Sequence, residues 1–187
     1  YPMLSQAASK DNYDDLKRTI IYGLNIIMLI TIPATIGIIV LANPIVKVAF
    51  ERGAFDSTAT YMTVGALTFY AIGLAASSMK SMLNRAYYSL QDTRTPMVNS
   101  FITLCLNVIL NLIFVRFMAH KGLALATSLS SIVTLLYLLY KLRQKIGAFG
   151  FMKSVKCLIK SLGAAAVMGI IVYFVDDMLA GFMGNGN

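Results

Sequence analysis

Long stretches without a charged residue alternate along this chain with short polar intervals. Four of the uncharged stretches are long enough to cross a bilayer as helices, a crossing that takes about 20 residues: 19–46, 57–79, 97–115 and 122–140. A fifth, 161–175, reaches this length if it extends back over Cys157 while Lys160 snorkels to the interface. The pattern predicts an all-α fold, a polytopic transmembrane bundle of about five spanning helices.

The composition agrees with a membrane protein. Hydrophobic residues make up 58% of the 187 residues, charged residues make up 13%, and the mean hydropathy is +0.72. A soluble domain carries about 45–50% apolar and about 25% charged residues. The net charge of +8 does not indicate a nucleic-acid partner, because the basic residues stand beside the apolar stretches and form no basic run with interleaved aromatics.

The basic residues are divided unequally between the two sides that five spans define. One side receives four of the 16 Lys and Arg residues: Lys47, Arg52, Arg116 and Lys121. The opposite side receives all the others: Lys10, Lys17, Arg18, Lys80, Arg85, Arg94, Lys141, Arg143, Lys145, Lys153, Lys156 and Lys160. Because basic residues accumulate in cytoplasmic loops, we expect the first residue and the interval 80–96 at the cytoplasmic face.

This arrangement divides the chain into three segments. Residues 1–18 are expected to hold the end of a preceding helix and a cytoplasmic connector, with a short amphipathic helix capped by Asp11 or Asn12. Residues 19–145 hold four transmembrane helices. Residues 146–187 hold a basic amphipathic connector suited to anionic lipid headgroups, one further transmembrane helix and a weakly structured tail. Because the chain does not begin with methionine, we expect a fragment of a longer protein.

The densest polar interval lies at 80–96. Lys80 directly follows an uncharged stretch, so it falls within the cytoplasmic half of a span. An ionisable group at that depth is costly and usually faces the bundle interior or a water-filled cavity. The alternative is a lysine that snorkels to the interface from a helix end. Arg85 lies nearer the end of the span, where we expect it to pair with lipid phosphate or a carboxylate.

The remainder of this interval is typical of a turn between two helices. Tyr87 and Tyr88 have amphipathic rings of the kind that lie at membrane interfaces. Pro96 suits the first turn of the following helix. Either Thr93 or Thr95 is expected to cap that helix.

Two asparagines lie within the third uncharged stretch. Asn107 and Asn111 are four residues apart and therefore share one helix face. Buried amides need partners. Hydrogen bonding between helices is the commoner role of such residues in membranes, and a polar path through the bundle is the alternative.

Two positions are candidates for flexing. Pro33 stands in the middle of the first uncharged stretch and predicts a kink there. Asn43 and Pro44 mark the expected exit from that span, and Gly53 permits a turn before the next one.

Motifs of enzyme chemistry are absent. The sequence contains no HExxH, GxSxG, Walker A or GxGxxG motif, and its acids lie in connectors or at the ends of spans rather than as an intramembrane pair. Two cysteines are too few for a zinc site, so no metal or cofactor is expected. A transporter or a scaffold fits better than an enzyme, and inward cations suit an anionic cargo.

An ordered set of segments carries a family resemblance: YPMLSQAA, IPATIGIIVLANPIV, FERGAF, GLAASSMKSMLNRAYYSLQDTRTP, LNVILNL and GLALATSLSS. In this order they resemble the MurJ/MviN family, the lipid II flippases of bacterial peptidoglycan synthesis. The resemblance runs over roughly 1–145 and is more diffuse in 146–187. It implies the fold of the multidrug/oligosaccharidyl-lipid/polysaccharide exporter superfamily, with two six-helix lobes around a central cavity. This chain would supply part of the C-terminal lobe.

The resemblance also implies roles for particular residues. Lys80 matches a lysine of the cavity that receives the pyrophosphate of lipid II, and Arg52 belongs to the repeated RGAF element near the outer end of the lobe. A structural or gating role at the cytoplasmic turn is implied for Arg85, Asp92, Thr93, Thr95 and Pro96. Other cavity cations of the family fall outside this chain, so the chain alone is not expected to transport.

The implied mechanism is alternating access in the bacterial cytoplasmic membrane. Transport would draw on the membrane potential or on the gradient of an ion that these residues do not identify. The resemblance also implies cell-wall synthesis proteins as partners. Two alternatives stay open: an exporter of another polyprenyl-linked oligosaccharide or drug, and a structural membrane subunit that moves no cargo.

Overall fold

The computed structural model describes residues 13–52, 55–147 and 151–184, and within these ranges every regular element is a helix. The elements are α2 (Tyr13–Val40), α3 (Ala42–Phe50), α4 (Ser57–Ser89), α5 (Arg94–Ile146) and α6 (Phe151–Gly184). Five segments are long and apolar enough to cross a membrane: Asp15–Val40, Ser57–Ser89, Arg94–Met118, Lys121–Ile146 and Ser154–Val175. The predicted all-α bundle of five spans is confirmed.

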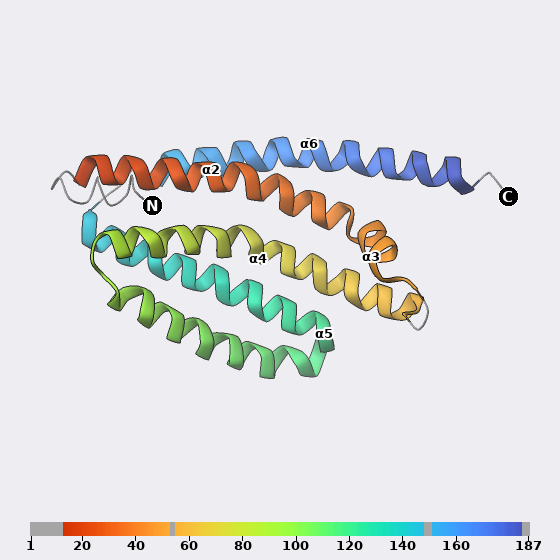
Figure 1. Ribbon diagram of the computed structural model, residues 1–187, viewed down its shortest axis with the longest axis horizontal. Helices are drawn as coiled ribbons and strands as arrows, with labels where there is room; N and C mark the ends of the chain where they lie inside the picture. Colours follow the sequence, from red (N-terminus) through yellow and green to blue (C-terminus); the bar gives the residue numbers. More distant parts are fainter. Residues whose placement is uncertain (1–12, 53–54, 148–150, 185–187) are drawn as a thin grey trace.

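The long helices lie side by side, and their connections gather at two opposite ends of the bundle (Figure 1). The turn between α4 and α5, the end of α5 and the beginning of α6 lie at one end (Figure 1). The short helix α3 and the fold-back within α5 lie at the other end. The predicted division of basic residues between two membrane faces depends on this alternation of ends.

Helix α5 is a hairpin of two arms (Figure 1). The first arm, Arg94–Met118, and the second arm, Lys121–Ile146, are separate spans that run in opposite directions. A Cβ atom at Gly122 would lie 2.5 Å from the carbonyl oxygen of Phe114, so this close approach of the two arms requires glycine. The turn expected between the third and fourth uncharged stretches is therefore present.

The second arm of α5 lies between its own first arm and α4. Gly73 of α4 brings the backbones together, because a Cβ atom there would lie 2.7 Å from the Cα atom of Ser128. The Ser128 hydroxyl donates a hydrogen bond to the Phe69 carbonyl across this contact. Small residues allow membrane helices to approach this closely.

The hydrophobic core lies where α2, α4 and the second arm of α5 meet. Helix α2 contributes a stripe at four-residue spacing, as expected for one face of a helix: Leu16, Ile20, Leu24, Met28 and Ile32. Leu83 and Tyr87 of α4 and Leu138 and Leu142 of α5 complete it, all fully buried.

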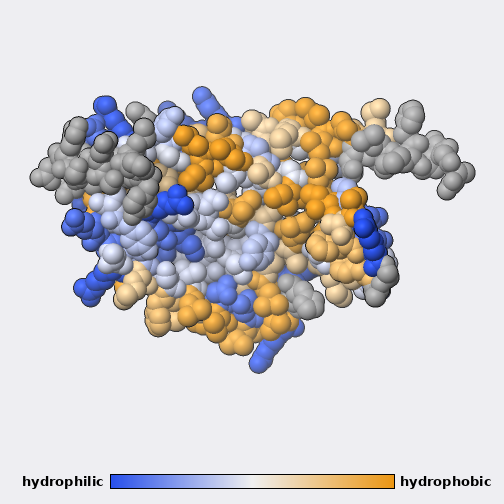
Figure 2. Space-filling model, viewed as in Figure 1, coloured by the Kyte–Doolittle hydropathy of each residue, from blue (hydrophilic) through white to orange (hydrophobic). Residues whose placement is uncertain are grey.

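Helix α6 packs along α2 through small residues. Ala165 is fully buried, and a Cβ atom at Gly169 would lie 2.8 Å from the Cγ2 atom of Ile36. The opposite face of α6 exposes large apolar side chains, including Ile170 and Phe174. Figure 2 shows such hydrophobic surface over the middle of the bundle, with hydrophilic side chains at its ends.

Two element boundaries differ from the prediction. The first span ends at Val40, and the chain resumes at Ala42 as the separate helix α3. Asn43 and Pro44 therefore lie in the first turn of α3, where proline is tolerated because that turn needs no N–H donor. At the other boundary, α2 runs from Tyr13 into the span without a break, and the candidate caps Asp11 and Asn12 lie outside the described residues.

The C-terminal segment is also more regular than expected. Helix α6 begins at Phe151 and continues to Gly184, so the basic residues before the fifth span belong mainly to the ends of α5 and α6. No separate amphipathic helix lies between them in the described residues. The expected weak tail is helical as far as Gly184, because the apolar residues of this segment favour continuation of the helix.

Candidate functional site

Lys80 lies inside a membrane span, on a face of α4 that is half-buried. The 33 residues of α4 extend over about 50 Å, which exceeds the hydrocarbon thickness of about 30 Å. Lys80 stands about 14 Å along the axis from the end of α4 at Ser89. Its ammonium forms no hydrogen bond or ion pair with any residue that the structure describes. A cation in this position is available to an anionic group from outside these residues.

A small pocket lies next to Lys80 on the outer side. It has a volume of about 120 Å³, and we call it the hydroxyl pocket; it is lined by Tyr70, Gly73, Leu74, Ser77, Thr127, Ser128 and Ser131. Its α4 residues follow helical spacing, and Lys80 comes three residues after Ser77, about one turn nearer the cytoplasmic end. The cation and the hydroxyl pocket therefore follow one another along α4.

The two asparagines connect the arms of α5 behind the hydroxyl pocket. The Asn107 amide donates to the hydroxyls of Thr127, at 3.2 Å, and of Ser130, at 3.3 Å. Asn111 donates to the Asn107 side-chain oxygen at 2.9 Å. The Asn107 contacts join the two arms, which is the commoner role, whereas Asn111 bonds to Asn107 within its own arm. A polar path through Asn107 and Asn111 stays a prediction.

Arg52 lies between α3 and α4, far from Lys80 along the helix axis. It is exposed in the turn that follows α3, at the end where α4 begins (Figure 1). The stretch of α4 from Ser57 to Lys80 rises about 35 Å. Within this chain, Arg52 and Lys80 therefore do not meet in one site, and a cavity role for Arg52 stays a prediction.

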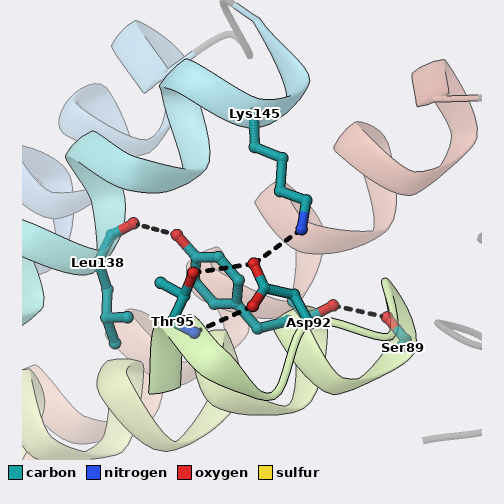
Figure 3. A network of polar contacts seen from close by, with 7 residues as sticks. Ser89, Asp92, Thr95, Leu138 and Lys145 are labelled. Atoms are coloured by element: carbon teal, nitrogen blue, oxygen red, sulfur yellow. Dashed lines mark hydrogen bonds and ion pairs between the residues drawn. The ribbon is translucent and has the colours of Figure 1, made fainter. Parts of the chain in front are cut away.

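The turn between α4 and α5, predicted at the cytoplasmic face, is organised by one carboxylate (Figure 3). The two oxygens of Asp92 accept hydrogen bonds from the Thr95 N–H at 2.9 Å and from the Thr95 hydroxyl at 2.8 Å. The Lys145 ammonium, at the end of α5, lies 2.7 Å from the same carboxylate. We call these three residues the Asp92 network. It joins the beginning and the end of the α5 hairpin.

The cap of α5 differs from the prediction. Thr93 occupies the cap position but makes no side-chain cap hydrogen bond, and Thr95 donates to Asp92 instead of accepting from the backbone. Asp92 fills this role because its carboxylate accepts from the N–H three residues ahead. Pro96 is fully buried in the first helical turn, as predicted. Arg85 is exposed and forms no ion pair with a described residue, so its pairing with lipid phosphate stays a prediction.

The contacts of the Asp92 network change the acidity of this carboxyl group. Its partial burial alone would raise the pKa of Asp92. The hydrogen bonds from Lys145 and Thr95 and the positive charge of Lys145 outweigh burial and lower the pKa to about 2. Asp92 is therefore ionised at every physiological pH.

This lowered pKa predicts an acid-labile turn. A carboxyl group with a depressed pKa in the folded state stabilises the fold above its unfolded pKa, and this contribution is lost as the pH falls through the folded value. The thermal unfolding midpoint of the chain should exceed that of the Asp92→Asn variant by a constant difference above about pH 4. The difference should shrink as the pH falls toward 2. A difference that is the same at pH 7 and pH 2 would show that the Asp92 charge does not stabilise the turn.

Gln91 adopts a backbone conformation that ordinarily favours glycine. Its φ angle is +56°. The Asp92 N–H donates to the Tyr87 carbonyl at 3.0 Å and the Gln91 N–H donates to the Tyr88 carbonyl at 3.1 Å. This pair of bonds is the Schellman motif, which ends a helix through a left-handed residue.

Glycine at this position should stabilise the chain. Because a side chain in the left-handed region costs about 1–2 kcal/mol and glycine adds about 0.5–1 kcal/mol of unfolded-state entropy, Gln91→Gly should gain about 0.5–1 kcal/mol. The measurement is the thermal unfolding midpoint in detergent. Gln91→Ala is the matched control, because it keeps Cβ and should bring no gain. An equal gain in both variants would indicate that the lost glutamine side chain, not the backbone, is responsible.

The roles of two residues in this region were not predicted from the sequence. Tyr87 is not an interfacial aromatic, because it is fully buried and its hydroxyl donates to the Leu138 carbonyl at 2.8 Å. Its position four residues after Leu83 in the buried stripe of α4 was the available signal. Tyr88 is exposed, as predicted. The sequence predicts Lys145 only as one of the cytoplasmic basic residues. Its ion pair with Asp92 joins positions 53 apart in sequence.

Of the two candidate flex points, the structure describes only Pro33. Pro33 lies inside α2, and the later part of this helix slopes away from its earlier part (Figure 1). Its role as a hinge stays a prediction. Gly53 lies outside the described residues.

Comparisons with known proteins agree on one family. A family model described as "Lipid II flippase MurJ" matches residues 1–185. A "Probable lipid II flippase MurJ" of Vibrio cholerae is 32% identical over 179 residues, which cover 95% of this chain and 34% of that protein. A "Lipid II flippase MurJ" of Thermosipho africanus is 33% identical over 163 residues, covering 87% and 31% respectively.

A solved structure of the same family also resembles the chain. The chain superposes on a structure titled "Lipid II flippase MurJ, inward closed conformation" with a TM-score of 0.80 and 30% identity, over 94% of this chain and 36% of that one. The chain thus spans about a third of the length of the relatives that it matches. The resemblance found in the sequence is confirmed over nearly the whole chain, including the segment after residue 145 where the motifs were diffuse.

Proposed function

Because the chain belongs to the lipid II flippase MurJ family, we propose that it forms one wall of a transport pathway for lipid II. The cargo is an undecaprenyl-pyrophosphate-linked disaccharide-pentapeptide. It crosses the bacterial cytoplasmic membrane by alternating access, and the remaining two thirds of such a transporter would supply the rest of the pathway. The observation that carries the proposal is the position of Lys80, within a span and without a described counter-ion.

Lys80 is suited to the charged part of such a cargo. A pyrophosphate inside a membrane needs compensating positive charge, because an isolated ion in a medium of low dielectric constant is very costly. An ammonium on a flexible stem follows a moving phosphate without demanding one geometry. Lys80 lies in the inner half of the span, where a cargo that enters from the cytoplasm arrives first.

The hydroxyl pocket is suited to the sugar part. Ser77 and Ser131 line it on facing helices, together with the exposed Tyr70. Hydroxyl groups both donate and accept, so they exchange readily with sugar hydroxyls and water. A saccharide that follows its phosphate past Lys80 therefore meets matching groups, while the polyprenyl chain remains in lipid.

The cytoplasmic turn has a different role in this proposal. The Asp92 network holds the turn after α4 and both arms of α5 together at one end, so this part of the wall moves as one unit. The energy for transport would come from the membrane potential or from an ion gradient. Contacts with cell-wall synthesis proteins belong to the complete transporter.

A chimera tests the proposal. Residues 1–185 replace the matching segment of the Vibrio cholerae relative, and the chimera is expressed in cells depleted of their own lipid II flippase. We expect the chimera to restore growth and to lower the amount of lipid II on the inner face of the membrane. The control is a chimera in which the same segment comes from an exporter of another polyprenyl-linked oligosaccharide, which should not restore growth.

Two results would contradict the proposal. A chimera that is expressed, inserted and folded but leaves lipid II on the inner face would show that this wall does not serve lipid II. Growth restored equally by both chimeras would show that the segment is a scaffold without selectivity for the cargo.

A further inference from the structure

A second, larger groove lies at the opposite end of the molecule from the Asp92 network. It has a volume of about 480 Å³ and lies between α3 and the beginning of α4. We call it the outer groove; it is lined by Asn43, Lys47, Glu51, Ser57, Thr60, Tyr61 and Val64. This volume falls within the range of about 300–1,000 Å³ that is usual for small-molecule sites. The groove contains none of the residues of the hydroxyl pocket.

The α3 wall of the outer groove carries charges of both signs. Glu51 ends α3, where its N–H donates to the Lys47 carbonyl at 3.1 Å. Its carboxylate accepts a hydrogen bond from the buried Thr60 hydroxyl at 3.2 Å. Lys47 stands one helical turn before Glu51, is exposed, and forms no ion pair with any residue of the described ranges. An ammonium and a carboxylate thus line one groove, one helical turn apart along the chain.

A second cation, Lys121 of α5, lies over the α4 wall at the rim of the groove. The Lys121 ammonium lies 3.9 Å from the ring centroid of Tyr61. Its aliphatic stem lies over Gly65, where a Cβ atom would collide with it. Tyr61 is 69% exposed beneath this cation. The rim therefore adds positive charge and an aromatic face to the hydroxyls of Ser57 and Thr60.

The outer groove lies at the level of lipid headgroups. Helix α4 is about 20 Å longer than the hydrocarbon core, so both of its ends, including the first turns beside the groove, extend beyond the core when the helix is centred in the bilayer. An exposed tyrosine together with lysines is typical of the membrane interface. Hydrophilic side chains meet hydrophobic surface at this end of the molecule (Figure 2).

We propose that the outer groove binds the phosphoethanolamine headgroup of a membrane phospholipid. The phosphate lies against Lys47 and Ser57, near the Lys121 cation, and the ammonium donates to the Glu51 carboxylate. A purely anionic headgroup would leave Glu51 facing negative charge. A quaternary ammonium has no N–H to donate to Glu51. The mixed charges of the groove therefore select a zwitterion that carries a primary amine.

Retention of defined lipids tests this assignment. The 187-residue chain is reconstituted in nanodiscs with equal parts of phosphatidylethanolamine, phosphatidylglycerol and phosphatidylcholine, and the lipids retained after detergent extraction are measured by native mass spectrometry. We expect phosphatidylethanolamine to be retained preferentially. Lys47→Gln should lower its retention about tenfold, since it removes a charge-assisted hydrogen bond. Glu51→Gln keeps an acceptor for Thr60 and should remove the preference over phosphatidylglycerol.

Matched variants and competitors complete the test. Lys47→Arg should retain the lipid, and Arg116→Gln, an exposed substitution near the fold-back of α5 and outside the groove, should have no effect. Unchanged retention in Lys47→Gln, or an unchanged preference in Glu51→Gln, would overturn the assignment. Displacement of the lipid by millimolar inorganic phosphate would also overturn it and indicate a site for free phosphate. The test does not depend on transport, so it can fail while the chimera still restores growth.

Discussion

Growth of flippase-depleted cells should be lost when Lys80→Gln is introduced into the chimera. The substitution removes the positive charge that is expected to accompany the pyrophosphate through the inner half of the membrane. Charge-assisted hydrogen bonds contribute about 1.5–3 kcal/mol, so the transport rate should fall at least about tenfold. Lys80→Arg keeps the charge and should keep most of the activity. The rate is measured as the appearance of lipid II on the outer face of the membrane.

Stability separates this effect from simple misfolding. A lysine within a span is costly to the fold, by about 2.5–3.5 kcal/mol at the helix centre on insertion scales. Lys80→Gln should therefore leave the thermal unfolding midpoint unchanged or raise it while transport is lost. Full growth with Lys80→Gln at normal expression would show that Lys80 does not touch the cargo and snorkels to the interface instead.

The second large effect is expected at Gly73, where Gly73→Leu should prevent α4 from packing on the second arm of α5. The new Cβ atom would lie 2.7 Å from the Cα atom of Ser128, and this neighbour is backbone that does not rotate away. Overpacking of this kind costs about 3 kcal/mol. We expect little folded protein in detergent, measured as the fraction that elutes as a single species in size-exclusion chromatography.

Gly163→Leu is the matched control for this substitution. Gly163 also lies in a membrane span, but a Cβ atom there meets nothing within 4 Å. It should leave the amount of folded protein unchanged, and Gly73→Ala should fall between the two leucine variants. Equal losses from Gly73→Leu and Gly163→Leu would indicate that the added bulk disturbs membrane insertion, rather than the contact with Ser128.

The five spans were predictable because a membrane helix can be recognised from a short local stretch of sequence. Each needs only a run of about 20 residues without charge, and this chain has few charges to interrupt the runs. The helix ends were less predictable. The break at Leu41 has no glycine or proline at its centre, and the left-handed residue that ends α4 is Gln91. Such ends are decided by carbonyl and N–H partners that only the folded chain supplies.

The candidate site shows the same division between local and distant information. Lys80 was found because one charge beside a long apolar run is conspicuous. The partners that complete the polar clusters come from far along the sequence. Lys145 reaches Asp92 across 53 positions, and Lys121 reaches Tyr61 from the other helix. No spacing rule connects such pairs, so they became visible only when the helices were placed side by side.

The unequal fastening of the two ends has a mechanical consequence. At the end predicted to be cytoplasmic, Asp92 accepts two hydrogen bonds from Thr95, forms an ion pair with Lys145 and donates its N–H to the Tyr87 carbonyl of α4. In the opposite half, the Ser128 hydroxyl bonded to the Phe69 carbonyl and the Lys121 ammonium over the Tyr61 ring join α4 and α5, without an ion pair between described residues. A tilt of about 5° about the tied end moves the far end of a helix about 50 Å long by about 4 Å, but moves Lys80 by only about 1 Å. In the proposed transporter, a tilt about this end would therefore leave Lys80 nearly in place while the opposite end of the wall moves.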